Sequence, residues 1–301
     1  MTPDLTQASR TDSAVRARRE PPRLALVLGS GGVRSIAAVG VVDRLAREGV
    51  APDLIVGCSS GALFGATIAL GMTAEEALDA AMSLWSADLT QHRRWRAYPQ
   101  MVAPRLAGFD EDFSLRDNRV IADRLRSAFG DARLESLAIP LRVAATDAIT
   151  GPAVVLEQGS VVEALLASMA VPFLFPSVDV GGRRLVDGVI SDPLPVAAAA
   201  DAELVLTLGF EGTMPRRIDR ASRLAAQATT ALINNLMRAR VEAARASGQR
   251  IVALELALER HVGLWETSAL PYLLEAGRRS ASLHLPRIAD ELLGQQACVA
   301  V

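Results

Sequence analysis

The chain has 301 residues, of which half are apolar and 22% are charged, so it can bury a sizeable core as one large domain or two small ones. Its formal net charge of -2 gives no reason to expect a nucleic-acid partner. The two cysteines, Cys58 and Cys298, are too few for a disulfide framework or a cysteine-based zinc site, and they indicate reduced cytoplasmic thiols.

The first 22 residues are predicted to form a disordered basic tail, because they are polar, rich in arginine and end at Pro21-Pro22. They contain no apolar stretch of the kind that a secretory signal needs. No apolar run elsewhere reaches the ~20 residues of a membrane-spanning helix. These features predict a cytoplasmic protein, with residues 23–301 as one domain, that can still bind peripherally at the inner membrane surface.

Strands and helices alternate in the first part of this domain. Residues 24–28 form an apolar run that leads into a glycine loop, and residues 34–48 follow with apolar side chains at helical spacing. A second strand is predicted at 53–56 and a second helix at 60–70. This order of strand, helix, strand and helix predicts an α/β fold with a parallel sheet.

The rest of the chain is predicted to contain helices with an irregular interruption over residues 72–135, then strands, then a mostly helical part beyond 216. The later strands are predicted at 141–145, 153–156, 177–180, 184–186, 204–208 and 251–254. Gly181-Gly182, between two of these strands, indicates a tight hairpin. No internal repeat or linker is evident, which favours a single domain with a helical C-terminal part.

Ser59 lies between Gly57 and Gly61 in the stretch GCSSGA, after the second predicted strand and before the second helix. In such a Gly-x-Ser-x-Gly pattern the serine lies on a sharp turn, where small neighbours let a substrate reach its hydroxyl. The N–H of Ser60 and the positive end of the helix face the charge that develops during reaction. The pattern alone also occurs in ordinary turns. The strand-turn-helix context favours a nucleophile.

The glycine loop LGSGGVRS, residues 28–35, has two interpretations. A dinucleotide-binding loop needs a third glycine or alanine where Arg34 stands, and an acidic residue at the end of the second strand, whereas Asp53 begins that strand. The alternative is an oxyanion hole, in which the N–H groups of Gly31 and Gly32 stabilise a tetrahedral anion by about 3 kcal/mol each. The second interpretation fits the loop better. Arg34 is either an exposed helix residue or part of this site.

A reactive serine needs a base, and histidine is the usual one. The chain has three histidines, His92, His261 and His284. None of them follows a predicted strand. Asp187 is the better candidate, because it ends the second strand of the hairpin and Gly188 leaves space beside it. Asp147 and Asp192 are competitors, although Asp192-Pro193 is more typical of a turn or cap.

With the glycine loop, the serine turn and the aspartate in this order, the chain resembles the patatin-like phospholipase family. The resemblance covers nearly everything from Leu24 to Val196. It rests on LALVLGSGGVRSIAAVGVVDRL, PDLIVGCSSGALFGA and SMAVPFLFPSVDVGGRRLVDGVISDPLPV, and continues weakly in LPYLLEAGRRSA. Members of this family are lipid acyl hydrolases with a serine-aspartate dyad. The resemblance therefore implies a three-layer α/β/α fold with a mainly parallel central sheet.

The resemblance also implies roles for individual residues. Ser59 would be the nucleophile and Asp187 the base, and the amides of Gly31 and Gly32 would form the oxyanion hole, with Arg34 at the family's basic position in the same loop. The implied reaction is cleavage of carboxylic ester bonds in phospholipids, lysophospholipids or related acyl esters through an acyl-enzyme. It needs no metal or organic cofactor. Cys58 and Ser60 then flank the nucleophile and do not compete with it.

This chain departs from the family pattern at three positions. Ser30 and Ser35 replace the first and last glycines of the family's Gly-Gly-Gly-x-Arg-Gly loop. Val189 stands where the family has glycine or alanine after Asp-Gly. Because the central glycines and both dyad residues are present, these departures bear on substrate fit more than on activity.

Two other functions are compatible with a serine turn and a glycine loop. An acyltransferase of the malonyl-transferase type shares this layout but needs a histidine base, and no histidine stands where Asp187 does. A catalytically weak, lipid-binding regulatory relative could keep the serine motif without turnover. Fluorophosphonate labelling of Ser59 would distinguish an active enzyme from such a relative.

Two further stretches have open interpretations. HRRWRAYPQM, residues 92–101, places Trp95 and Tyr98 among arginines, which suits either a lid or membrane contact at the level of lipid head groups, or an ordinary exposed loop. Residues 221–246 carry an apolar stripe that suits either homo-oligomer formation or core packing, and core packing is preferred. The stripe comprises Leu232, Ile233, Leu236 and Met237.

Overall fold

The computed structural model describes residues 23–85, 94–111, 113–214 and 217–299. The strands are β1 (Leu24–Leu28), β2 (Leu54–Cys58), β3 (Leu141–Asp147), β4 (Ala153–Leu156), β5 (Val178–Val180), β6 (Arg183–Asp187), β7 (Leu204–Leu208) and β8 (Ile251–Ala253). The helices are α1 (Ala37–Ala46), α2 (Ser60–Ala69), α3 (Ala74–Leu84), α4 (Ala97–Val102), α5 (Arg119–Phe129), α6 (Val161–Ser168), α7 (Ala221–Ala246) and α8 (Leu270–Val299). The predicted N-terminal tail lies outside the described residues.

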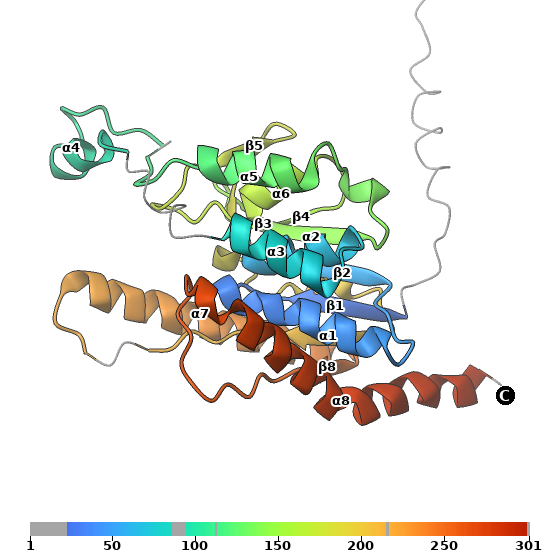
Figure 1. The fold of residues 1–301 in the computed structure, drawn as a ribbon. Coiled ribbons are helices and arrows are strands. Elements are labelled where there is room, and N and C mark those ends of the chain that lie inside the picture. Colours follow the sequence, from blue (N-terminus) through green and yellow to red (C-terminus); the bar gives the residue numbers. More distant parts are fainter. Residues whose placement is uncertain (1–22, 86–93, 112, 215–216, 300–301) are drawn as a thin grey trace, which may run out of the picture.

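One mixed sheet organises the molecule, with strand order β5-β6-β3-β2-β1-β7-β8 and with β4 also paired to β3. The pairs from β3 through β2, β1 and β7 to β8 are parallel, and the pairs that involve β4, β5 and β6 are antiparallel. Helices cover both faces of this sheet (Figure 1). The prediction of a three-layer α/β/α fold with a mainly parallel sheet is confirmed.

The central strand β1 is buried on both faces, which explains why it is apolar without interruption. Leu24, Leu26 and Leu28 face a core shared with α1, α2 and α8. Ala25 and Val27 face a second core, which the turn η5 (Val196–Ala199) and the second half of α7 complete. Because side chains alternate across a strand, a strand between two helical layers needs apolar residues at every position.

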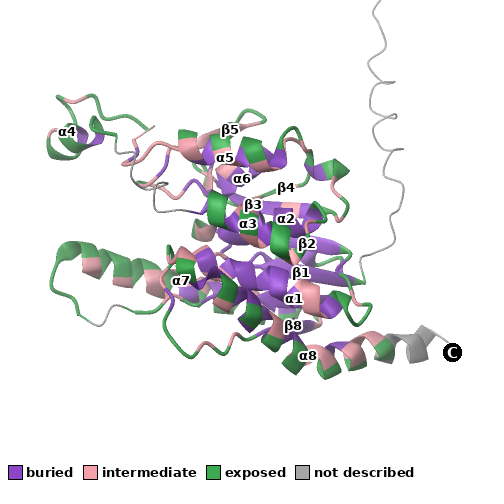
Figure 2. Cartoon of the chain, in the orientation of Figure 1, coloured by how far each residue is buried: buried purple, intermediate pink, exposed green. Residues whose placement is uncertain are grey.

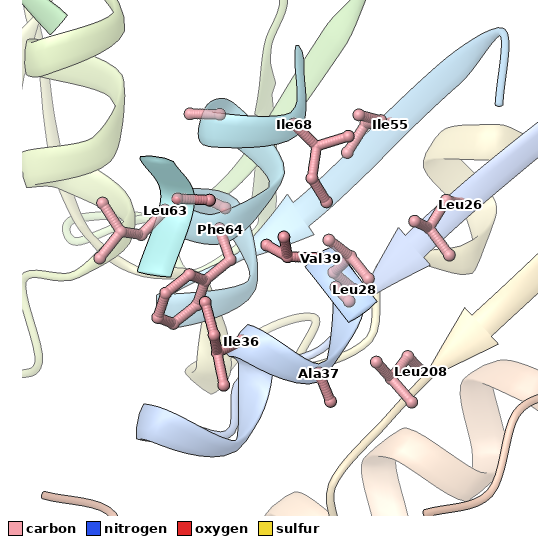
Figure 3. Packing of buried hydrophobic residues seen from close by; sticks show 14 of the residues in the cluster. Leu26, Leu28, Ile36, Ala37, Val39, Ile55, Leu63, Phe64, Ile68 and Leu208 are labelled. Atoms are coloured by element: carbon pink, nitrogen blue, oxygen red, sulfur yellow. The ribbon is translucent and has the colours of Figure 1, made fainter. Parts of the chain in front are cut away.

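The larger core lies under α2 and the start of α1 (Figure 3). There Phe64 of α2, which is fully buried, lies beside Ile36 and close to Leu28 of β1. Close packing at this point sets the position of the loop between β1 and α1 and of the turn between β2 and α2. Both predicted functional motifs therefore rest on the same rigid core.

Two glycines allow α1 and α8 to approach closely. A Cβ atom at Gly40 would lie 2.0 Å from the carbonyl oxygen of Leu274, and one at Gly277 would lie 2.0 Å from the carbonyl oxygen of Ala37. No side chain fits at either position without separating the two helices. The stretch LPYLLEAGRRSA, which extends the family resemblance weakly, is thus the part of α8 that packs on α1.

The hairpin prediction at Gly181-Gly182 is confirmed, since β5 and β6 pair antiparallel around these residues. Both glycines have positive φ, +58° and +77°, as a tight two-residue hairpin turn requires. The hairpin ends at Asp187, the last residue of β6.

The pairing of β3 determines which residues of the other strands become neighbours. Ala144 pairs with Cys58 of β2 and with Val155 of β4, and Ala145 pairs with Asp187 of β6 and again with β4. β4 therefore pairs with one edge of β3 at both positions, which leaves the opposite edge for β2 and β6. On that edge Cys58 and Asp187 pair with neighbouring residues of β3. The end of β2 and the end of β6 therefore meet.

The preference for core packing along residues 221–246 is only partly correct. Met237, in the second half of α7, is buried against the sheet, whereas Leu232 is 71% exposed. The apolar stripe continues beyond the edge of the sheet, where nothing in the described chain covers it. Among the described helices, none is both long and apolar enough to span a bilayer.

Replacing Gly277 with alanine should destabilise the fold by about 2–3 kcal/mol, because the added methyl group collides with the backbone of α1. Urea unfolding of the purified variant measures this change. Gly263→Ala is the matched control, since the nearest atoms to its added methyl group are 4.0 Å away. Equal stability of the two variants would contradict the close packing of α1 and α8.

Candidate active site

Ser59 lies on a strained turn between β2 and α2. Its backbone has φ 55° and ψ -125°, a region that residues other than glycine rarely adopt. A Cβ atom at Gly57 would lie 2.4 Å from Cα of Ala62, and one at Gly61 would lie 2.5 Å from the carbonyl oxygen of Leu28. The two glycines flanking the serine are therefore required by the tight turn, which is the geometry expected of a nucleophile elbow.

A buried serine on α6 holds this turn in place. The N–H of Ser59 donates to Oγ of Ser168 at 2.8 Å, and the Ser168 hydroxyl donates to the carbonyl oxygen of Ala144 at 2.7 Å. The Ser168 hydroxyl thus connects the strained Ser59 to strand β3. Sequence reasoning missed this role, although Ser168 begins the stretch SMAVPF on which the family resemblance partly rests.

The structure brings the predicted serine and aspartate together. The Ser59 hydroxyl donates to Oδ2 of Asp187 at 2.8 Å. The other carboxylate oxygen, Oδ1, accepts the N–H of Val189 at 2.9 Å and has Sγ of Cys58 4.0 Å away. Asp187 is completely buried, and the hydrogen bonds to its two oxygens fix the orientation of its carboxylate.

Burial raises the pKa of Asp187 to about 7, because the charged carboxylate loses its hydration. The hydrogen bonds from Val189 and Ser59 oppose this shift. The carboxylate is thus a much stronger base than a free aspartate and is still partly ionised near neutral pH. Burial, followed by the charges of Asp187 and Asp192, also raises the pKa of Cys58, so that its thiol stays protonated.

The glycine loop is attached to the serine turn by a chain of three hydrogen bonds, which we call the serine clip. The N–H of Gly31 donates to Oγ of Ser60 at 3.0 Å, Oγ of Ser60 lies 2.9 Å from Oγ of Ser35, and the Ser35 hydroxyl donates to the carbonyl oxygen of Gly29 at 3.4 Å. Ser35 and Ser60 are almost fully buried. Ser35 occupies the position of the last glycine in the family's glycine-rich loop.

The serine clip changes which amides are free to bind an anion. The N–H of Gly31, predicted as an oxyanion donor, is already used by Ser60. Among the described residues, no hydrogen-bond acceptor is found for the N–H of Gly32, which has φ +61° and packs against the backbone of Leu264. The N–H of Ser60, at the first position of α2, likewise has no intrahelical partner.

Arg34 supports the loop from its other side. Its Nε donates to the carbonyl oxygen of Gly31 at 3.1 Å, its Nη1 donates to the carbonyl oxygen of Glu211 at 3.2 Å, and its guanidinium lies over the ring of Phe210. Burial lowers its pKa, but an arginine remains protonated at any physiological pH. Arg34 is therefore a half-buried cation at the edge of the site and not a fully exposed helix residue.

Ser59 and Asp187 open into an apolar cavity of about 290 Å³. Leu63 and Phe175 contribute to its walls, and the stacked rings of Trp85 and Trp265, with centroids 5.0 Å apart, border it. A few polar groups, such as Arg34 and Asn234, line the remainder. An apolar cavity with few polar groups beside a reactive serine suits a substrate with a long hydrocarbon part.

The competing candidates for the base lie elsewhere or have other partners. Asp147 does not line the cavity, and its Oδ1 accepts the N–H groups of Ile149 and Thr150 in a turn. Asp192 lies in a turn, as predicted, with its N–H donating to the carbonyl oxygen of Gly188 at 2.8 Å. Its carboxyl group is buried, with Oδ1 3.6 Å from Nε of Arg240. Burial raises its pKa to about 6.

No histidine lines the cavity among the described residues, and His92 lies outside them. Within the described part of the chain, no group of three or more histidine, cysteine, aspartate or glutamate side chains is arranged to hold a metal ion. The only acidic residue that contacts Ser59 there is Asp187.

An elbow serine bonded to a buried strand-end aspartate, beside a glycine loop on an α/β sheet, is the arrangement of a serine-aspartate hydrolase. The family model described as patatin-like phospholipase matches residues 26–200, more than half of the chain, and includes all of these elements. The chain therefore belongs to the patatin-like phospholipase family, and the predicted resemblance is confirmed.

Curated relatives are similar over the same region. An uncharacterized NTE family protein of Mycobacterium tuberculosis is 35% identical over 204 residues, which cover 67% of this chain and 53% of that protein. Patatin-like phospholipase domain-containing protein 7 of Rattus norvegicus is 29% identical over 192 residues, which cover 62% of this chain and 13% of that protein. The chain thus spans about half the length of the mycobacterial relative and a smaller part of the rat protein.

Two solved structures are more distant. VipD from Legionella pneumophila is 13% identical with a TM-score of 0.45, covering 89% of this chain and 67% of VipD. ExoU of Pseudomonas aeruginosa, in its complex with SpcU, is 16% identical with a TM-score of 0.43, covering 89% of this chain and 52% of ExoU. Because both scores are low, the family assignment rests on the family model.

The raised pKa of Asp187 predicts how stability depends on pH. An unfolded aspartate titrates near 3.9 and the folded one near 7, so its contribution to stability is present at low pH and is lost as the pH rises through 7. Asp187→Asn cannot ionise. Its free energy of unfolding relative to wild type should therefore increase by about 2–3 kcal/mol between pH 5 and pH 8.

Urea unfolding at the two pH values measures this difference. Asp147→Asn is the control, because hydrogen bonds from the Thr150 and Ile149 backbone lower the pKa of Asp147, which is ionised throughout that range. A parallel pH dependence of wild type and Asp187→Asn would show that the aspartate is not desolvated.

The serine clip predicts coupled effects of its two hydroxyls. Ser60→Ala should cost about 1–3 kcal/mol of stability, because the N–H of Gly31 loses a buried acceptor. Ser35→Ala should cost a similar amount, and the double variant should cost less than the sum of the two. The exposed Ser136→Ala serves as control, with an expected change within about 0.5 kcal/mol. Strictly additive losses in unfolding experiments would rule out a connected clip.

Proposed function

We propose that this protein is a serine lipid acyl hydrolase that cleaves carboxylic ester bonds through a Ser59-Asp187 dyad. The observation that carries the proposal is the 2.8 Å hydrogen bond from the Ser59 hydroxyl to a completely buried carboxylate, at the wall of an apolar cavity. Membership of the patatin-like phospholipase family supports it. Since the chain spans only part of its relatives, its own activity and substrates belong to this proposal.

The first step transfers one proton and forms one bond. Asp187 accepts the Ser59 proton while Oγ attacks the ester carbonyl carbon, whose oxygen becomes an oxyanion. The intermediate then releases the alcohol, which takes the proton back from Asp187, and leaves an acyl-serine. In the second half Asp187 accepts a proton from water, the hydroxide attacks the acyl-serine, and Ser59 recovers its proton as the fatty acid leaves.

The oxyanion in this proposal is bound by the N–H groups of Gly32 and Ser60. Both are free of other acceptors among the described residues and both line the same cavity as Ser59, one in the glycine loop and one at the start of α2. Gly31 contributes indirectly, because its N–H is bonded in the serine clip and its carbonyl oxygen, in the peptide that carries the Gly32 N–H, accepts from Arg34. This assignment keeps the predicted loop but moves one donor from Gly31 to Ser60.

The substrate class follows from the cavity. Its walls are leucine, isoleucine, methionine and aromatic side chains, which lower the free energy of a hydrocarbon chain removed from water by about 0.8 kcal/mol per CH₂ group. The polar groups of Arg34 and Asn234 lie on the same cavity and suit the oxygen-rich part of a glycerolipid. Phospholipids, lysophospholipids and related acyl esters remain the candidates.

The dyad is tested with a short p-nitrophenyl ester and a fluorophosphonate probe. Ser59→Ala should abolish both turnover and labelling, because the nucleophile is absent. Asp187→Asn should lower turnover by about 10²–10⁴-fold, the usual contribution of a general base. Initial rates at pH 8, where the wild-type carboxylate is largely ionised, give the comparison.

Ser136→Ala, an exposed serine outside the cavity, is the matched control and should retain full activity. Substantial turnover by Asp187→Asn would exclude the aspartate as base. If wild-type protein neither turns over the ester nor reacts with the probe, the lipid-binding relative without catalysis would be the better description.

A further inference from the structure

Two segments project from the layered body, and we call them arm 1 and arm 2. Arm 1 comprises residues 94–111 and contains α4. Arm 2 comprises residues 217–233 and contains the first half of α7. Both stand away from the three layers toward the same side of the molecule (left in Figure 1). In Figure 2 both are mostly exposed, in contrast to the sheet.

Both arms begin at the wall of the active-site cavity. Where arm 1 returns to the body, the N–H of Leu115 donates to the carbonyl oxygen of Phe173 at 2.8 Å, and Phe173 is followed by the cavity residue Leu174. Arm 2 supplies Thr230 and Ile233 directly to the cavity lining. Both arms therefore join the body beside the cavity that contains Ser59.

Arm 1 exposes large apolar side chains to an unusual degree. Leu106 is 92% exposed, Val102 is 87% exposed and Trp95 is 74% exposed. Within α4 only Ala97 and Gln100 are buried. Scattered exposed apolar residues are ordinary, but several on one projecting segment mark an interaction site.

The helical part of arm 2 packs against the described chain only near Thr230 and Ile233. None of residues 221–233 is buried, and no charged side chain occurs from Leu224 to Met237. A single helix of this length is only marginally stable in water unless one face is packed. An exposed, uncharged helical surface that includes Leu224 and Leu232 calls for a partner with an apolar layer.

The charges on the arms favour an anionic partner. The following arm residues form no ion pair with any residue that the structure describes: Arg96, Arg105 and Arg217. Two acidic arm residues already have a basic partner, Glu111 in Arg184 and Asp219 in Arg223. Within the part of the chain that the structure describes, the arms thus carry positive charge without an ionic partner, on a chain whose total is -2.

We propose that the two arms dock the protein on an anionic lipid bilayer, with the cavity facing the lipid. The proposal rests on the lipid substrate proposed above. Apolar side chains would enter the head-group boundary while the arginines contact lipid phosphates, the combination by which peripheral proteins bind membranes. A second copy of the chain fits less well, because a symmetric contact through the arms would bring their uncompensated arginines together.

The test measures vesicle binding separately from catalysis. Ser59→Ala protein is sedimented with vesicles of phosphatidylcholine alone and of phosphatidylcholine with an equal part of phosphatidylglycerol. This background removes hydrolysis, so that a failure of the proposed chemistry does not affect the result. Stronger binding to the anionic vesicles is expected.

Three variants distinguish the contributions of the arms. Val102→Asp with Leu106→Asp, and Leu224→Asp with Leu232→Asp, should each weaken anionic vesicle binding about 10-fold or more. Arg96→Gln with Arg105→Gln should reduce the preference for anionic vesicles by about 10-fold. Leu283→Asp, a change at a similarly exposed leucine on α8, is the control and should bind as before.

With Ser59 intact, the same variants should hydrolyse a soluble short ester at the wild-type rate, which verifies that they are folded. Unchanged vesicle binding of both arm variants, or no binding by the parent protein, would overturn the proposal. So would a dimer in size-exclusion chromatography that the arm substitutions dissociate, because the arms would then cover a second copy.

Discussion

The register of one strand determines whether this molecule has a reactive centre. On β3, Ala144 and Ala145 are paired with Cys58 and Asp187, so the ends of two strands separated by more than a hundred residues meet on the same side. Ser59 follows Cys58 directly. A shift of β3 by one residue would turn its side chains to the opposite faces and would separate serine from aspartate. The burial of Leu141, Val143 and Ala145 on β3 opposes that shift.

Much of the fold was predictable, because strands buried on both faces are apolar without interruption. β1, β2 and β7, which are buried at every position, lie where such runs predict them. The other five strands were predicted from shorter runs and turn signals, and all predicted ends lie within two residues of the observed ones. Gly181-Gly182 and the glycines around Ser59 were predictable for a related reason, since tight turns demand them. The exposed outer half of α7 was not, because Leu232 and Met237 belong to one apolar stripe in the sequence although only Met237 is buried against the sheet.

The active site likewise contains residues that the sequence predicts and residues that it does not. Ser59, Asp187 and the glycine loop belong to ordered local motifs, whereas their supporting contacts join residues distant in the sequence. Ser168 lies 109 residues from Ser59, and no local pattern marks a serine whose hydroxyl bonds an N–H group on another element. The same holds for Asp192, whose position before Pro193 suggests a turn while its carboxyl group faces Arg240. Tertiary hydrogen bonds of this kind leave no periodic signal.

The serine clip also bears on the chemical selectivity of the two adjacent hydroxyls. Ser60 accepts the N–H of Gly31, and because Ser35 donates to Gly29, the Ser60 proton points to Ser35. Among the described residues no carboxylate is bonded to the Ser60 hydroxyl to take its proton, whereas Ser59 has the Asp187 carboxylate. Two chemically identical groups in sequence thus differ in reactivity through hydrogen-bond direction alone, and an electrophile entering the cavity meets one nucleophile.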